Sequence, residues 1–371
     1  MSQNEEPRSD AVSAYIRTLL ANHPEMHGEL LGDWRRGNRK TADGPPPVLP
    51  FPKLQAPAAT GPNEVWVPVF RKKAIEQQES EAESRGHEGE RLRLWLRRAA
   101  RHGGQRRLVE PPSLDGLVDA FPNFAEAIEY LEVHFALARH LPASERNVPP
   151  MLLVGPPGIG KTTFAEALAR VLGISYRIAA LGSAQAGFEL TGTSRHWATH
   201  TPGVVCSLLA EGEAANALLV LDETDKMGGD ARYPVENGLL DLLEPQSARR
   251  FRDHALDIEF DASRLVILGT ANDVRGLSAP LASRFEIIGI DPPTADQRRR
   301  IIWSLWNKLH SRLGCEVSLT EDAVEGACRS GASPREIRRA LRTALGMALR
   351  NRQHTITDLR LAPVIERRVG F

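Results

Sequence analysis

The glycine-rich segment GPPGIGKT, at residues 155–162, limits what this chain can fold into more than any other feature. It matches the pattern GxxxxGK[ST], and it lies between a short apolar run at 151–154 and a predicted helix over 162–172. Glycines allow the backbone to wrap around a phosphate without Cβ clashes, and the following helix directs its positive N-terminal end at the same place. The sequence therefore predicts a phosphate-binding loop between a strand and a helix.

This predicted P-loop assigns a nucleotide-binding role to a continuous run of residues. Lys161 is expected to reach the β- and γ-phosphates of ATP, and the Thr162 hydroxyl is expected to coordinate Mg²⁺. The full predicted set is Gly155, Pro156, Pro157, Gly158, Ile159, Gly160, Lys161, Thr162 and Thr163.

Two carboxylates end a second apolar run, at 217–221. Open α/β sheets bind ligands at the carboxyl ends of their strands, so Asp222 and Glu223 are expected to lie beside the P-loop. Asp222 would hold Mg²⁺ through its water shell, and Glu223 would orient and polarise the attacking water. The alternative is an acidic strand end that caps the next helix.

A third apolar run, at 265–269, leads to Asn272. A neutral amide at that strand end can sense the γ-phosphate and help to position water. Otherwise an asparagine after a strand is simply a turn former.

Two arginines complete the predicted catalytic set. Arg284, in the segment SRF, could neutralise phosphate charge from a neighbouring subunit, which would require a closed oligomer; the alternative is a surface pair with Glu286. Arg335 lies in the first turn of a predicted helix, where its charge opposes the helix dipole, so it is expected to face the nucleotide. The alternative for Arg335 is a pair with Glu336 or another acidic neighbour.

Length and composition indicate a soluble cytoplasmic protein without a membrane partner. The 371 residues are 42% hydrophobic and 25% charged, and the formal net charge is zero, so the whole chain has no general attraction to polyanions. The three cysteines have no CxxC spacing, and His196, His200 and Cys206 lack convincing zinc spacing. We find no signal-peptide pattern and no apolar run near the roughly 18 residues of a membrane span.

The chain divides into three predicted regions. Residues 1–108 combine short helices with a proline-rich linker at 45–68, interrupted by a possible edge strand at 65–70, and are expected to be partly disordered. Residues 109–291 alternate strands and helices, which indicates an α/β domain with a parallel sheet and flanking helices. Residues 292–371 contain helical patterns at 297–313, 322–329 and 334–351, which predict a small all-helical lid domain.

An arginine-rich segment at 91–107 has two possible interpretations. It could be a basic helix that contacts nucleic acid, anionic lipid or an acidic partner. It could also be a surface helix with its charges in water, because a single aromatic residue is not a stacking platform for bases.

Taken in order, these motifs resemble those of AAA+ ATPases, and more closely the ATPase module of Lon proteases. The resemblance covers residues 110–350 and rests on GPPGIGKTTFAEALARVLG, LLVLDETDKMGGD, LLDLLEP, FRDHALDIEFDASRLVILGTAND and LASRFEII. It implies ATP and Mg²⁺ as cofactors. It also implies the following roles: Lys161 and Thr162 on phosphate and magnesium, Asp222 and Glu223 as the acidic pair, Asn272 as first sensor, Arg284 as arginine finger and Arg335 as second sensor.

The same resemblance bears on client binding and on peptidase activity. In Lon-like rings a loop corresponding to 191–203 lines the central pore, and Trp197 is at the position of its client-gripping aromatic residue. The rest of that loop departs from the family. Lon proteases also carry a peptidase domain with a Ser–Lys dyad, whereas the only lysine after Lys226 here is Lys308. We therefore expect an ATPase and not a peptidase.

Three functions remain open from the sequence. The first is an ATP-driven ring, expected to be a hexamer, that unfolds or remodels protein clients, alone or with a separately encoded peptidase. The second is a nucleic-acid-associated motor or loader that uses residues 91–107. The third is a nucleotide-gated scaffold without hydrolysis, which the complete catalytic set makes the weakest of the three.

Overall fold

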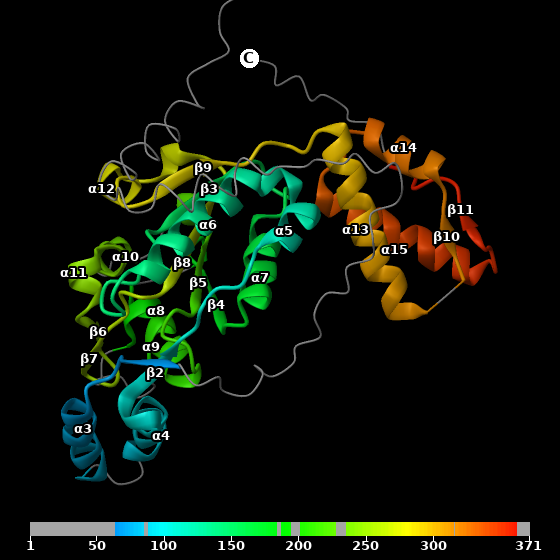
Figure 1. Cartoon of the computed structure of the whole chain (residues 1–371). Coiled ribbons are helices and arrows are strands. Elements are labelled where there is room, and N and C mark those ends of the chain that lie inside the picture. The colour runs from blue at the N-terminus through cyan, green and yellow to red at the C-terminus, as the bar shows by residue number, and fades with distance from the viewer. Residues whose placement is uncertain are drawn as a thin grey trace, which may run out of the picture. The chain divides into compact units, whose positions relative to one another are not determined.

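The computed structural model of the chain describes residues 64–84, 88–183, 187–193, 201–227, 235–314 and 316–361. Its centre is a five-stranded sheet with strand order β4-β5-β8-β3-β9, in which all neighbouring strands are parallel (Figure 1). The strands are β3 (Met151–Val154), β4 (Tyr176–Ala180), β5 (Leu218–Asp222), β8 (Val266–Ala271) and β9 (Glu286–Gly289). This confirms the predicted α/β class with a P-loop topology.

The central strands are apolar on both faces because both faces are covered. Successive strand residues point to opposite sides of a sheet, so Leu152, Leu219 and Ile267 belong to one hydrophobic cluster, whereas their neighbours in the strands belong to another. The second cluster is completed by α5 (Asp115–Ala120), α6 (Ala125–His140) and α7 (Lys161–Leu172). The first is completed mainly by α4 (Glu88–Ala100), α9 (Val204–Glu211) and α10 (Val235–Leu243).

Short elements connect the sheet to its surroundings. A two-stranded antiparallel hairpin, formed by β6 (Phe251–Asp253) and β7 (Ile258–Phe260), precedes β8. The remaining elements of this region are α8 (Phe188–Thr191), the 3-10 turn η4 (Thr224–Lys226), α11 (Pro245–Ala248), the 3-10 turn η5 (Val274–Gly276) and α12 (Ala279–Ala282).

An N-terminal unit of two helices and two strands packs on this core. β1 (Val65–Pro68) pairs antiparallel with β2 (Gln105–Leu108), and α3 (Lys72–Ser84) and α4 lie between them in the chain. The predicted edge strand at 65–70 is thus present as β1. The proline-rich positions before residue 64 lie outside the described residues, as does the predicted disorder there.

Arg106 ties this N-terminal unit to the core. Its guanidinium is buried and donates to the carbonyls of Arg98 and Ala99 in the last turn of α4, and to those of Leu209 and Ala210 in the last turn of α9. It also donates to the carbonyls of Arg101 and Gln105. The negative ends of two helix dipoles therefore share one cation. Burial lowers the pKa of Arg106 to about 10, which leaves it charged at neutral pH.

Residues 292–361 contain a separate hydrophobic cluster and are called the lid here. The lid is helical, with α13 (Ala295–Leu313), α14 (Glu321–Arg329) and α15 (Pro334–Arg350), apart from the two-residue parallel pair β10 (Ser318–Leu319) and β11 (Thr355–Ile356). Capping boxes start α13 at Thr294 and α15 at Ser333. Each predicted helix pattern in this region corresponds to one of these helices.

Candidate nucleotide site

The P-loop has the backbone shape that its glycines predict. Gly158 and Gly160 have φ values of +83° and +113°, in a region that side-chain-bearing residues rarely adopt. A Cβ at Gly155 would lie 2.4 Å from the carbonyl oxygen of Ile290, so this position admits only glycine. Helix α7 begins immediately afterwards at Lys161. A glycine-rich loop of this shape that leads directly into a helix fits phosphate, because backbone N–H groups and the positive helix end can both face the anion.

Lys161 is buried at the start of α7 and connects the P-loop to β8. Its ammonium donates to the carbonyl of Gly155 at 2.6 Å, to that of Pro156 at 3.3 Å and to Asn272 Oδ1 at 3.2 Å. Burial lowers the pKa of Lys161, while the negative charges of Asp225 and Asp222 act to raise it. Lys161 and Asn272, which were each predicted to face the nucleotide, are thus within hydrogen-bond distance of each other.

Thr162 and Asp222 bring two side-chain oxygens together beside the P-loop. The Thr162 hydroxyl lies 3.1 Å from Asp222 Oδ1, and the Thr270 hydroxyl donates to the same carboxylate oxygen at 2.6 Å. Mg²⁺ is held in proteins through one or two oxygen side chains together with water and substrate phosphates, so this pair fits it. Thr270 was not predicted from the sequence, although its place in β8, two residues before Asn272, could have indicated it.

Glu223 follows Asp222 in a left-handed backbone conformation, with φ 56° and ψ 47°. A non-glycine residue in this region costs roughly 1–2 kcal/mol, and such strain is concentrated at functional sites. The backbone N–H of Glu223 donates to the Thr270 hydroxyl at 3.1 Å, and its Oε1 accepts from Lys226 Nζ at 2.6 Å. A Cβ at Gly182 would lie 2.5 Å from Glu223 Oε2, so the carboxylate lies against the backbone that follows β4. Lys226 and Gly182 were not predicted.

The structure places Arg335 beside the P-loop. A Cβ at Gly158 would be 3.6 Å from the Cβ of Arg335 and 3.4 Å from the Ser333 hydroxyl oxygen. The alternative pair with Glu336 does not form, because the Glu336 carboxylate accepts from the N–H and hydroxyl of Ser333 as part of the helix cap. Arg335 also lies close enough to Lys161 to lower the pKa of that lysine.

Arg284 lies apart from the other predicted residues. Its Nη1 donates to the carbonyl of Pro280 at 2.9 Å, and its Nε lies 3.9 Å from Glu244 Oε2. The carboxylate near it is therefore Glu244 and not Glu286. Neither of these two contacts involves a residue of the P-loop.

Trp197 lies outside the described residues, but both ends of its loop are described. Thr193 N donates to the carbonyl of Thr201 at 3.1 Å, and Gly203 N donates to Asp253 Oδ2 at 2.8 Å. Asp253 is fully buried and its other oxygen accepts from two further backbone N–H groups of the β6–β7 hairpin. This carboxylate therefore joins the start of α9 to that hairpin.

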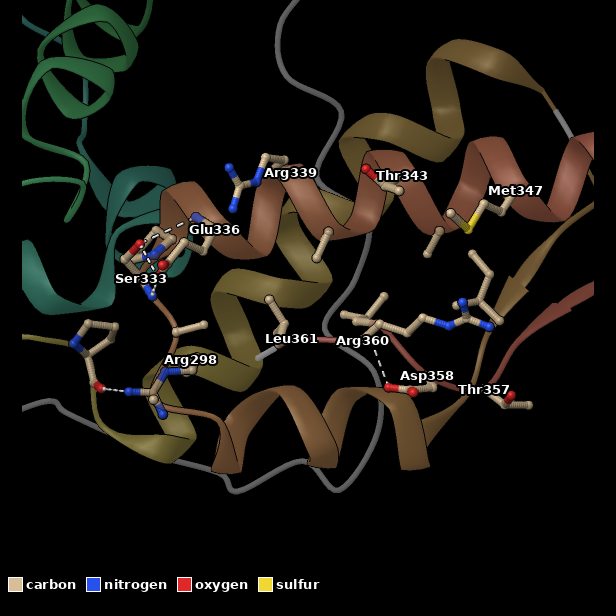
Figure 2. A pocket seen from close by; sticks show the side chains of 18 of the residues that line it. Arg298, Ser333, Glu336, Arg339, Thr343, Met347, Thr357, Asp358, Arg360 and Leu361 are labelled. Atoms are coloured by element: carbon tan, nitrogen blue, oxygen red, sulfur yellow. Dashed lines mark hydrogen bonds between the residues drawn. The ribbon is translucent and has the colours of Figure 1, made fainter. Parts of the chain in front are cut away.

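A groove of about 1020 Å³ runs along the lid beside the P-loop. Figure 2 shows Glu336, Arg339, Thr343 and Met347 along one face of α15, opposite the segment that contains Asp358 and Leu361. Pro156, Pro157 and Ile159 contribute the P-loop end of the groove, but Lys161, Thr162 and Asp222 do not line it. The groove is therefore distinct from the phosphate and metal positions.

Most of the arginine-rich segment at 91–107 is committed to contacts within the chain. Arg98 pairs with Glu211 at 2.8 Å, Arg101 with Glu213 at 3.1 Å and Arg107 with Glu64 at 2.9 Å, and Arg106 is buried as described above. Leu92 and Leu96 are buried in the core, and Arg91 and Arg97 are exposed. These contacts favour the surface-helix interpretation.

Comparison with known proteins agrees with this geometry. The sequence profile of the family described as "ATPase family associated with various cellular activities (AAA)" matches residues 151–291, from the first residue of β3 to just beyond β9. Residues 151–291 form an AAA ATPase domain. This AAA domain contains the P-loop, the acidic pair, Asn272 and Arg284, whereas Arg335 follows it in the lid.

Lon proteases are among the relatives of the AAA domain. The Lon protease of Frankia alni is 34% identical over 200 residues, which are 52% of this chain and 23% of that protein. The Lon protease of Rhizobium meliloti is 37% identical over 174 residues, which are 47% of this chain and 21% of that protein. The chain thus spans about a quarter or less of the length of these relatives.

A solved structure with a similar arrangement is the RuvB Holliday junction branch migration motor of Thermotoga maritima. It has 22% sequence identity and a TM-score of 0.44, over 68% of this chain and 70% of that chain. Within the part of the chain that the structure describes, every helix is too short or too polar to cross a lipid bilayer.

Proposed function

We propose that this chain binds and hydrolyses ATP with Mg²⁺ and uses the energy, as a subunit of a ring, to unfold or remodel protein clients. The observation that supports ATP binding and hydrolysis is that the carboxyl ends of β3, β5 and β8 meet at the start of α7. There, Asn272 Oδ1 lies 3.2 Å from Lys161 Nζ, and Asp222 Oδ1 lies 3.1 Å from the Thr162 hydroxyl. The proposed domain boundaries are those of the sequence prediction, at 108/109 and 291/292.

Each residue of the site has a distinct task in this proposal. The P-loop N–H groups and Lys161 bind the phosphates, and Thr162 and Asp222 hold the metal with its water shell. Mg²⁺, when bound, would neutralise charge on the phosphate oxygens. Glu223 accepts a proton from the attacking water after leaving its resting pair with Lys226, and Asn272 orients that water.

The ring is proposed because Arg284 makes its contacts away from the chain's own P-loop. An arginine supplied by a neighbour requires a closed assembly, for which we propose a hexamer. Trp197 is the proposed client-gripping residue. We propose no peptidase activity for this chain, so any proteolysis would need a separately encoded peptidase.

The Glu223→Gln variant tests hydrolysis. It should retain Mg²⁺-dependent ATP binding and lose turnover by at least about 100-fold, because one group would no longer accept the proton from water. Lys161→Ala should instead lose ATP binding. Equal ATP affinity in wild-type protein and Lys161→Ala, or no affinity in either, would refute the nucleotide site.

Mixed assemblies test the role of Arg284. Arg284→Ala and Lys161→Ala subunits should each be inactive alone, and mixing them should restore part of the ATPase activity, because some Arg284-bearing subunits then lie beside intact P-loops. A lack of recovery, in mixtures shown by light scattering to co-assemble, would argue against action from a neighbour.

Client capture tests the remodelling part. ATP-loaded Glu223→Gln protein should retain unfolded polypeptides, and Trp197→Ala should weaken that retention. A steep salt-dependent affinity for DNA or RNA, abolished in Arg91→Ala/Arg97→Ala protein, would favour the nucleic-acid motor instead.

A further inference from the structure

Asp225 has a connecting place in the nucleotide site. It lies in η4, two residues after Glu223, and its carboxylate reaches across to the end of β8. Oδ2 accepts the backbone N–H of Asn272 at 2.9 Å and that of Asp273 at 3.3 Å. Two successive N–H groups on one oxygen fix the orientation of the peptide plane between these residues.

That peptide plane determines where the Asn272 side chain can point. Asn272 Oδ1 accepts from Lys161 Nζ at 3.2 Å, which places the amide over the start of α7. The backbone of η4 is also held tightly against this region, because a Cβ at Gly276 would lie 2.4 Å from the carbonyl oxygen of Asp225. A small shift of the Asn272 backbone would therefore move its amide away from Lys161.

We propose that Asp225 is a positioning residue for ATP hydrolysis, which acts by holding the Asn272 backbone so that the Asn272 amide faces the γ-phosphate position. This inference rests on the proposed function. It assigns to the third carboxylate of the β5 end a role that differs from metal binding by Asp222 and proton acceptance by Glu223.

The second oxygen of Asp225 supports a functional role. Asp225 Oδ1 is buried and has no hydrogen-bond partner within the described residues. A buried acceptor without a donor is unfavourable. If Asp225 served only to cap a turn, a side chain without this second, unpaired oxygen would be more stable here.

The test compares variants of the full-length chain in steady-state ATPase assays. Asp225→Ala removes the acceptor and should lower kcat by on the order of 100-fold, the effect of misplacing a catalytic group by about 1 Å, while the Kd for a fluorescent ATP analogue stays within about threefold. Asp225→Asn can still accept both N–H groups through its amide oxygen and should recover most of the activity. Turnover is expressed per nucleotide-binding site, so that misfolded protein is not counted as loss of chemistry.

A double-mutant cycle distinguishes positioning from a merely structural role. If Asp225 acts through Asn272, then adding Asp225→Ala to Asn272→Ala should lower kcat by no more than about twofold further. The matched control is Asp273→Ala. The Asp273 carboxylate, next along the chain from Asn272, pairs with exposed Arg275, so its removal should leave kcat within about twofold.

Three results would overturn the inference. The first is wild-type turnover in Asp225→Ala, and the second is equal impairment in Asp225→Asn and Asp225→Ala. The third is an equal fold-loss of kcat when Asp225→Ala is introduced into wild-type protein and into Asn272→Ala. Each requires an active wild-type enzyme. If wild-type protein itself fails to hydrolyse ATP, the proposed function fails and not the positioning role alone.

Discussion

The Thr270 hydroxyl donates to Asp222 Oδ1 across a distance of 2.6 Å, from the end of β8 to the end of β5. The same hydroxyl oxygen accepts the backbone N–H of Glu223 at 3.1 Å. One threonine thus orients the proposed metal-binding carboxylate and the strained backbone of the proposed proton acceptor together.

Replacing this hydroxyl should impair turnover with little change in shape. Thr270→Val keeps the branched side chain but removes a hydrogen bond to a charged group, which is worth about 1.5–3 kcal/mol. If that energy is lost in the transition state, kcat should fall about 10- to 100-fold in a coupled ATPase assay. Thr270→Ser should retain activity, and an equally active valine variant would contradict the orienting role.

The pair between Lys226 and Glu223 should restrain basal turnover. Both side chains are about half exposed, at 51% and 47%, so water screens the pair and its attraction is weak. Lys226→Met should therefore raise client-free ATPase activity by no more than about fivefold, because Glu223 would no longer need to leave its partner. A fall in turnover would instead indicate that Lys226 contributes directly to the site.

Arg106 should matter for stability far more than its exposed neighbours do. Arg106→Met leaves buried carbonyl groups of α4 and α9 without donors, and each such group costs about 1–3 kcal/mol. We expect a loss of at least about 3 kcal/mol, measured by urea unfolding of the Mg²⁺-free protein. The control Arg101→Met breaks an exposed pair and should cost under about 1 kcal/mol.

His134 should make the protein acid-sensitive. It is 3% exposed, and burial lowers its pKa to about 4, below the ordinary value near 6.5. Since the unfolded state binds the proton first as the pH falls, stability present above pH 6.5 is lost progressively down to about pH 4. Between pH 7 and pH 5 this amounts to about 2 kcal/mol.

Denaturant titrations at the two pH values test the role of His134. His134→Gln should lose correspondingly less stability than wild-type protein over this interval. An unchanged difference between pH 7 and pH 5 would show that another group causes the acid sensitivity.

The sequence predicted the central strands and the lid helices well because their patterns were strong. Strand β3 and helix α14 begin and end within one residue of the predicted ranges 151–154 and 322–329. The edge strands β4 and β9 were not predicted, because each has only one neighbour in the sheet and carries exposed residues such as Ile178 and Ile287. Their mixed composition lacks the compact apolar run of a strand that is buried on both faces.

The residues of the candidate site could be predicted only where they belong to a local sequence motif with a fixed spacing. The P-loop, Asp222 and Glu223 follow recognisable patterns, and their proposed roles remain predictions until activity is measured. Thr270, Asp225 and Lys226 contact the site where β5, β8 and η4 meet. Thr270 in β8 is more than 40 residues away in sequence from Lys226 in η4. No local pattern in either segment specifies which side chain of the other it will meet.

The hydrogen bonds of Arg106 also affect how the protein can be divided for study. An expression fragment beginning at residue 109 would keep the complete AAA domain but would lack the guanidinium that serves the end of α9. Helix α9 would then end in buried carbonyl oxygens that have no hydrogen-bond donor. Shortened versions should retain residues 64–108, and solubility lost on trimming should not be mistaken for evidence that this stretch recruits a partner.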